Sequence, residues 1–152
     1  MKALQKIFAL LLAAAIVALS AYAAEETPEA TPAPSIVLDT APAMNVADSW
    51  LAYIDTGRYA ESWDDSAAYF REAVPKIQWE TTLAQVRGPL GVAIARKVRS
   101  ATYTKMLPGA PEGEYVVIQY DTRFENRPQS VETVTPMREK NGKWKVAGYH
   151  IR

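Results

Sequence analysis

Apolar residues recur every three or four positions in the first part of the chain beyond residue 43, a spacing typical of one face of an α-helix. Three such stripes cover residues 44–57, 59–74 and 76–87. The first ends near a glycine, the second at a proline and the third at a Gly-Pro pair, all of which commonly end helices. The pattern therefore predicts three short amphipathic helices, each of which needs a partner surface to be stable.

From residue 96 onward the pattern changes to the two-residue period of β-strands, with many β-branched and aromatic residues. The turn-rich segments LPGAPEGE, ENRPQS and KNGK divide this region into four strands. In the second strand an apolar set alternates with a more polar set, which indicates one buried and one wet face; the two sets are Val116, Ile118, Tyr120 and Phe124 against Val117, Gln119, Asp121 and Arg123. Asn141-Gly142 predicts a two-residue hairpin turn of type I′, because both residues tolerate the positive φ that this turn requires.

Helices followed by a run of antiparallel strands predict the α+β class, with three helices packed on one face of a four-stranded meander sheet. We expect this domain to span residues 43–152, a length suited to one small domain. Residues 24–42 are rich in Pro, Glu, Thr and Ala and are typical of an extended tether.

The first 23 residues have the pattern of a secretory signal peptide: two lysines, an apolar run, and small residues around Tyr22. The apolar run is shorter than the roughly 20 residues of a membrane span. We therefore expect an exported protein, in the periplasm, that is not inserted in the membrane once the signal peptide has been cleaved.

Composition narrows the function classes. The chain contains no cysteine, so the domain must be held by its core without disulfides. Its 17 basic and 17 acidic residues balance, and removal of the signal peptide with its two lysines leaves a net charge of −2, from 15 basic and 17 acidic residues. This balance gives no electrostatic reason to expect nucleic acid as a partner.

Several spaced motifs occur in one order: DTGRYAESW, RGPLG, LPGAPEGEYVVIQYDTRFEN, VETVTPM and GKWKVAGYHIR. Together they resemble the bacterial family called domain of unknown function 4019, whose members are small exported proteins. The resemblance implies no reaction, cofactor or partner. In that family an aromatic residue commonly stands at the position of His150, which implies that the imidazole is dispensable. The layout is similar in outline to the nuclear transport factor 2-like and cystatin-like folds, an architectural analogy that carries no function.

Catalytic and metal chemistry find little support in the residue types. His150 is the single histidine, and the orienting carboxylates that the sequence offers it are Asp121 and Glu132 on other strands. Asp55-Thr56-Gly57 matches the aspartic protease triplet, but it follows a helical stripe and is better explained as a helix end. One histidine without cysteines leaves too few ligands for zinc, and no nucleotide or cofactor motif occurs. We expect no metal and no cofactor.

Two groups of residues are candidates for a site. Some of the aromatic residues can line a pocket between helices and sheet; these are Trp63, Tyr120, Phe124 and Tyr149. Arg87, Glu132 and Thr133 are the polar residues that interrupt apolar surroundings, and we expect Arg87 to pair with Glu132 across the boundary between helix and sheet, as a structural pair that orients the fold.

These observations favour a non-enzymatic domain that binds a small molecule or a protein. One alternative is a structural protein that self-associates through its sheet, for example as a homodimer. A further alternative is a small hydrolase or isomerase that uses Asp121, Glu132 or His150, which would require a carboxylate with a strongly perturbed pKa in a cleft.

Overall fold

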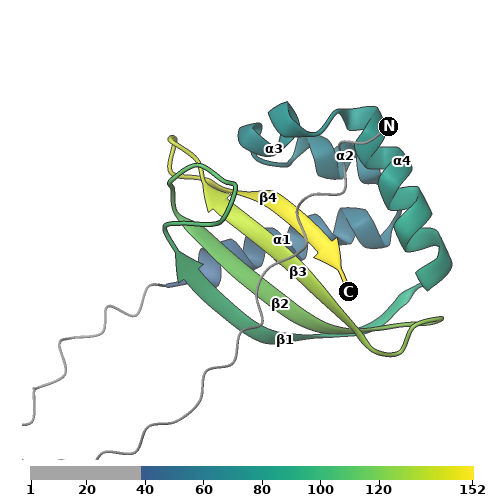
Figure 1. Ribbon diagram of the computed structural model, residues 1–152. Coiled ribbons are helices and arrows are strands. Elements are labelled where there is room, and N and C mark those ends of the chain that lie inside the picture. Colours follow the sequence, from purple (N-terminus) through teal and green to yellow (C-terminus); the bar gives the residue numbers. More distant parts are fainter. Residues whose placement is uncertain (1–38) are drawn as a thin grey trace, which may run out of the picture. The chain divides into compact units, whose positions relative to one another are not determined.

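The four strands form one antiparallel meander in the order β1-β2-β3-β4 (Figure 1). In this computed structural model, which describes residues 39–152, the strands are β1 (Ala93–Thr104), β2 (Tyr115–Phe124), β3 (Ser130–Arg138) and β4 (Trp144–Ile151). Helices precede the sheet along the chain, and the α+β class is confirmed. The alternation in β2 is confirmed as well, since Val116, Ile118, Tyr120 and Phe124 are buried.

The helical part contains four α-helices in place of the three expected. They are α1 (Ala41–Asp55), α2 (Tyr59–Asp64), α3 (Ala68–Ala73) and α4 (Lys76–Arg87), followed by the short 3₁₀ helix η1 (Gly88–Leu90). The second expected helix is broken at Ala67, whose backbone is extended at φ −58° and ψ 147°. There the N–H of Ala67 donates to the carbonyl of Val146 in β4 at 2.8 Å. A tertiary hydrogen bond has therefore overridden a continuous apolar stripe.

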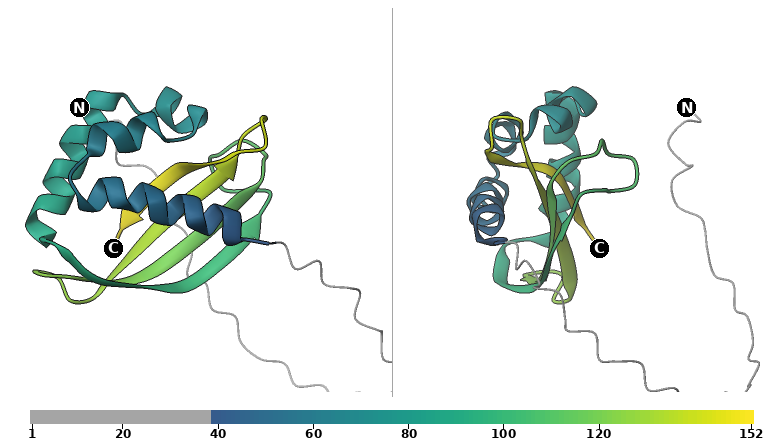
Figure 2. Two further views of the ribbon diagram at one scale, coloured as in Figure 1. Left: turned by 180° about the vertical axis from the view of Figure 1, so that it is seen from behind. Right: turned by 90° about the vertical axis from the view of Figure 1, so that its left-hand side faces the viewer.

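Among residues 39–152, one helix lies across a single face of the sheet. The helix α1 lies across that face and contacts β3 and β4, whereas α2, α3 and α4 lie beside β4 and the adjoining end of the sheet (Figures 1 and 2). The right-hand view of Figure 2 shows α1 against one side of the strands. The sheet thus has a helix-covered face and an uncovered face.

The core lies between α1 and the covered face and also includes Phe70 of α3 and Trp79 and Leu83 of α4. Its largest fully buried side chains include Trp50 and Leu51 of α1 and Phe124 of β2. The indole N–H of Trp50 donates to the carbonyl of Ser62 at 2.7 Å, so this buried polar group is satisfied. Each such large side chain contributes roughly 1.5–3 kcal/mol on burial, which is how a domain without disulfides is held together.

The β3–β4 turn differs from the prediction. Gly142 has φ 81°, but no non-glycine residue among residues 39–152 has a positive φ, so Asn141 does not form a type I′ turn. Instead the Gly142 N–H donates to the Glu139 carbonyl at 2.8 Å, and the Glu139 N–H donates to the Lys143 carbonyl at 2.8 Å. This is a three-residue loop, a tight turn followed by a glycine in the left-handed region. The hairpin predicted from Asn141-Gly142 is confirmed, and the predicted loop length of two residues is wrong.

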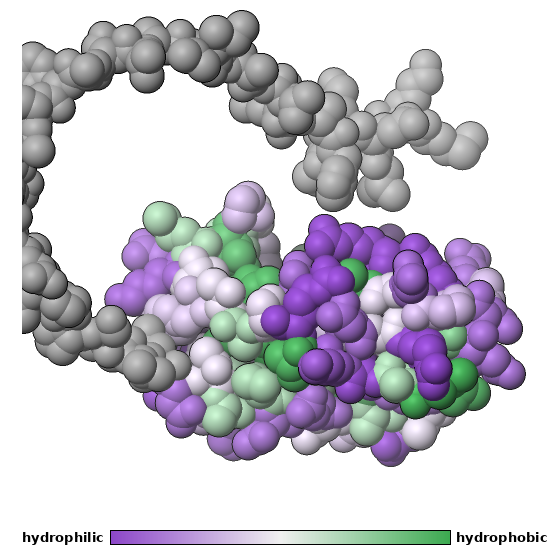
Figure 3. Space-filling model, turned by 90° about the horizontal axis from the view of Figure 1, so that it is seen from below, coloured by the Kyte–Doolittle hydropathy of each residue, from purple (hydrophilic) through white to green (hydrophobic). Residues whose placement is uncertain are grey.

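The two edges of the sheet differ in cover. The edge strand β4 contacts α1 and α3, whereas β1 has no neighbour on its outer side among the described residues. Two register irregularities interrupt β1, and Arg96 and Lys97 separate its exposed apolar residues Ile94 and Val98. Seen from below in Figure 1, the surface shows small green patches divided by purple (Figure 3). Bulges and charges of this kind protect an edge against pairing with other strands.

The predicted signal peptide and most of the predicted tether lie outside the described residues. The helix α1 begins at Ala41, two residues before the expected domain boundary, and its Pro42 is well placed because proline is favoured in the first helical turn. Within residues 39–152, no helix has the length and apolar character needed to cross a membrane.

Candidate functional site

Glu132 of β3 is the centre of a buried polar cluster at the end of the sheet where α1 and α4 also end. Glu132 is 0% exposed. Its carboxylate accepts hydrogen bonds from Arg96 Nε at 2.7 Å, Thr122 Oγ1 at 2.6 Å and the Tyr149 hydroxyl at 2.5 Å. Strand pairing explains this convergence, because Thr122 and Tyr149 lie on strands that flank β3 and their side chains share its covered face.

Asp55, at the end of α1, joins the same cluster through both of its oxygens. Arg96 forms a fork on it, with Nη1 at 2.8 Å from Oδ2 and Nη2 at 2.9 Å from Oδ1. Arg87, at the end of α4, donates to Asp55 Oδ1 at 2.9 Å. Two guanidinium groups and two carboxylates therefore alternate, which we call the Asp55–Glu132 network. It ties the ends of α1 and α4 to β1 and β3.

Burial and pairing set the electrostatics of this network. Burial opposes the charge of Arg96, but its hydrogen bonds to Asp55 and Glu132 outweigh that effect, so the pKa of Arg96 is raised and the group stays cationic. Burial and then the neighbouring Glu132 carboxylate raise the pKa of Tyr149, which keeps the phenol protonated as a donor. Arg87 lies over the Phe124 ring, with Cζ 4.4 Å from its centroid.

The expected pair of Arg87 and Glu132 is brought together, with Nη1 3.9 Å from Oε1. The shorter contacts are with other partners: Arg87 with Asp55 and Glu132 with Arg96. Sequence reasoning missed Asp55 because its triplet was explained as a helix end, and missed Arg96 because basic residues on an outer strand resemble a solvated edge. The position of Arg96 nevertheless indicates a buried partner, because it stands opposite Thr122 on the covered face of β1.

Of the four aromatic candidates, Tyr120 and Phe124 are buried and Trp63 and Tyr149 are partly buried. Tyr120 is 2% and Phe124 0% exposed. Tyr149 packs edge-on against Trp50, with ring centroids 5.4 Å apart, and the Trp63 indole donates to the Val74 carbonyl at 2.7 Å. Among the described residues, the depression near the β2–β3 turn and the one beside the β3–β4 turn include none of the four.

The three candidate catalytic residues lie on opposite faces of the sheet. His150 pairs with Thr133 on the uncovered face, and Asp121 also points to that face, whereas Glu132 points into the core. Burial and the nearby Arg152 lower the pKa of His150. Thr133 is buried, and its hydroxyl has no hydrogen-bond partner within the described residues. Among those residues, no three His, Asp or Glu side chains are grouped as metal ligands.

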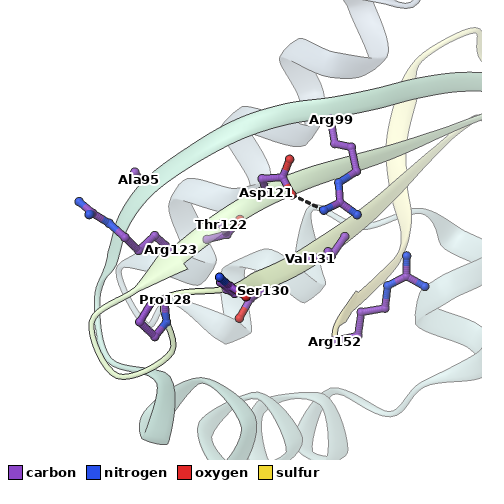
Figure 4. Close-up of a pocket in the computed structure, with 10 residues that line it drawn as sticks. Ala95, Arg99, Asp121, Thr122, Arg123, Pro128, Ser130, Val131 and Arg152 are labelled. Carbon is purple, nitrogen blue, oxygen red and sulfur yellow. Dashed lines mark hydrogen bonds and ion pairs between the residues drawn. The ribbon is translucent and has the colours of Figure 1, made fainter.

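The uncovered face carries a depression of about 570 Å³ near the β2–β3 turn, which we call the open-face depression. Figure 4 shows its lining side chains, with Arg99 reaching Asp121. The lining residues are Ala95, Arg99, Asp121, Thr122, Arg123, Pro128, Gln129, Ser130, Val131 and Arg152. A second depression of about 450 Å³ lies between α3 and the β3–β4 turn and includes Tyr69 and Met137.

A row of paired residues across the strands builds the open-face depression. Asp121 pairs with Val131, and Val131 exchanges both backbone hydrogen bonds with Arg152, at 2.8 and 3.0 Å. Strands lie about 4.8 Å apart, so Val131 separates the other two side chains. Arg99 comes from the register irregularity between Val98 and Ser100, and its Nη2 contacts Asp121 Oδ1 at 2.5 Å. An extra residue of this kind re-aims a side chain.

Comparison with known proteins identifies the family. The family model described as "Protein of unknown function (DUF4019)" matches residues 46–149. A search of curated proteins finds no significant match. The family match covers the four strands almost entirely and α1 from its second turn, so it includes both the Asp55–Glu132 network and most of the open-face depression.

Proposed function

Since the chain belongs to the DUF4019 family, whose description assigns no function, we propose from the geometry that it is a binding domain whose ligand occupies the open-face depression. The leader pattern of residues 1–23 supports an exported, periplasmic location for this domain. The observation that carries the proposal is the sheet itself: one face is filled by α1 and the core, and the other presents a depression that contains both apolar and charged side chains.

The binding role is favoured over catalysis by the state of the ionisable groups. Glu132 is enclosed by its three donors, and Asp121 on the opposite face is paired with Arg99. A general acid or base must lie within hydrogen-bond reach of its substrate and of an orienting partner. The depression offers instead a recognition surface, in which Ala95 and Val131 supply apolar area and the arginines supply donors.

Two tryptophan variants of β1 test the location of the site. Ala95 and Ser100 are both exposed, and their strand partners Arg123 and Gln119 place both on the uncovered face. Ala95 lines the depression, whereas Ser100 does not. Ala95→Trp therefore fills the depression without disturbing the core, and Ser100→Trp is its matched control.

Native mass spectrometry of the exported protein, purified gently, gives the readout. We expect an additional bound mass on the wild type and on Ser100→Trp, and its loss from Ala95→Trp. A bound mass that Ala95→Trp retains, or bare monomers for all three proteins, would contradict the proposal. A dimer that both variants dissociate would favour the alternative of self-association through the uncovered face.

A further inference from the structure

The charges of this near-neutral chain are divided between its two halves. Residues 39–91, which form the helices, contain eight acidic and four basic side chains, whereas residues 92–152, which form the sheet, contain eleven basic and six acidic ones. Arg99 and Arg123 are among the basic side chains of the sheet that are exposed on its uncovered face. The balanced total therefore conceals a basic sheet, and it is the local charge that attracts or repels a ligand.

The excess of basic side chains in the sheet is also found locally, around the open-face depression. Three arginines line it, and Asp121 is the one acidic side chain among its lining residues. Figure 4 shows the guanidinium groups of Arg99 and Arg152 on either side of Val131, while Arg123 points away from them. Arg99 and Arg152 thus border one apolar residue from two sides.

The donors of these two arginines are available. The Arg99 side chain is 45% exposed, and Asp121 Oδ1 engages its Nη2. Arg152 is exposed, and its side chain makes no ion pair or hydrogen bond within residues 39–152. A planar guanidinium with free N–H groups matches carboxylate and phosphate oxygens in two-point contacts.

We propose that the open-face depression binds an anionic group, a carboxylate or a phosphate, between the guanidinium groups of Arg99 and Arg152. This inference rests on the proposed function and gives its ligand a chemical class. Asp121 acts as an internal competitor, because it occupies Arg99 when no anion is bound and repels an incoming negative charge. The apolar surface of Ala95 and Val131 suits a short hydrocarbon portion next to the anion.

Titration followed by amide NMR tests the inference, with glutarate and inorganic phosphate as separate probes at constant ionic strength. We expect saturable shift changes centred on residues 121–123 and 129–131 and on Arg152. Arg99→Gln and Arg152→Gln should each weaken binding by about tenfold, the effect of losing one charge-assisted contact. Asp121→Asn should tighten it several-fold because the competitor is removed.

Arg138→Gln is the matched control for Arg99→Gln. Arg138 forms an exposed ion pair with Glu114 at 3.3 Å, with side chains 47% and 38% exposed, and it does not line the depression. The substitution Arg138→Gln removes one positive charge from the same sheet, as Arg99→Gln does, but outside the depression. It should therefore leave the affinity for the anion within twofold of the wild-type value. Equal weakening by Arg138→Gln and Arg99→Gln would show that the anions respond only to net charge, and this would overturn the proposal.

The two probes separate the sources of the anion. Binding of glutarate but not of phosphate assigns the site to carboxylates. Binding of phosphate but not of glutarate assigns it to phosphates. Each of these results supports the anion site. If neither glutarate nor phosphate changes the amide shifts, the inference is overturned. If native mass spectrometry still shows a bound mass that Ala95→Trp removes, the inference fails alone, because the depression then binds a ligand of another class; if that mass is missing too, the proposed function fails with it.

Discussion

Replacing Glu132 by glutamine should be the most damaging single change of charge in the domain. Glutamine keeps the volume and one acceptor, so it preserves the packing and isolates the loss of the charge. Glu132 is 0% exposed and faces Arg96 at 2.7 Å and Arg87 at 3.9 Å. Without it, Asp55 alone must balance two guanidinium groups, and the new amide N–H points at a donor.

The magnitude follows from the burial of the partners. Removing one partner of a buried ion pair costs about 3–5 kcal/mol, because the remaining charge is left uncompensated. Arg87 is the residue most affected, since its side chain is 4% exposed and its Nε and Nη1 already have no hydrogen-bond partner within the described residues. A small domain is stable by about 5–15 kcal/mol, so Glu132→Gln should remove a large part of the total.

Urea denaturation measures this loss, since urea, unlike guanidinium, does not screen charges. With a slope of about 1.5 kcal/mol per molar, the midpoint should fall by about 2–3 M. Glu114→Gln is the control, because Glu114 is 38% exposed in its pair with Arg138 and exposed pairs contribute about 0–1 kcal/mol. A loss below about 1 kcal/mol for Glu132→Gln, or equal losses for both variants, would refute the reasoning.

Two further predictions concern the backbone and the uncovered face. Gly57→Ala should cost about 1–2 kcal/mol, because its φ of 71° is unfavourable for alanine while no atom lies within 4 Å of the new Cβ; Gly91→Ala should cost more in the same urea assay, because its Cβ would stand 2.9 Å from that of Glu125. Arg152→Gln should raise the pKa of His150, followed by NMR, while burial still holds it below its ordinary value. Above about pH 6.5, His150 is neutral in the folded and the unfolded protein. As the pH falls through the lowered pKa of His150, the folded protein loses stability relative to the unfolded chain. Arg152→Gln should make this loss of stability smaller.

The elements and their order were predictable because each depends on local periodicity. The buried set of β2 and the glycines that end helices are read directly from spacing. The break at Ala67 was not predictable, because it depends on a hydrogen bond to Val146, a residue far along the chain. The loop length at Asn141-Gly142 also depends on where the two strands stop pairing, which the dipeptide alone does not determine.

The candidate site was predictable only in part, for a related physical reason. Arg87 and Glu132 could be singled out because a charge in an apolar context must be compensated. Their closest partners, Asp55 and Arg96, could not, since both stand at positions where a charge needs no special explanation, the end of a helix and an outer strand. The open-face depression left no signal in the pattern, because it arises from an irregularity in β1 that aims Arg99 across the sheet.

The two sites are connected by the alternation of β-strands. Asp121 and Val131 line the open-face depression as a strand pair, while the hydroxyl of the neighbouring Thr122 donates to Glu132 in the buried network. A slip of one residue between β2 and β3 would exchange the faces of β3 and place Val131 where Glu132 now accepts the hydrogen bond of Arg96. The network therefore makes alternative registers costly in addition to tying the helices to the sheet. On this reasoning, the buried Glu132 fixes the register that places Asp121 and Val131 together on the uncovered face.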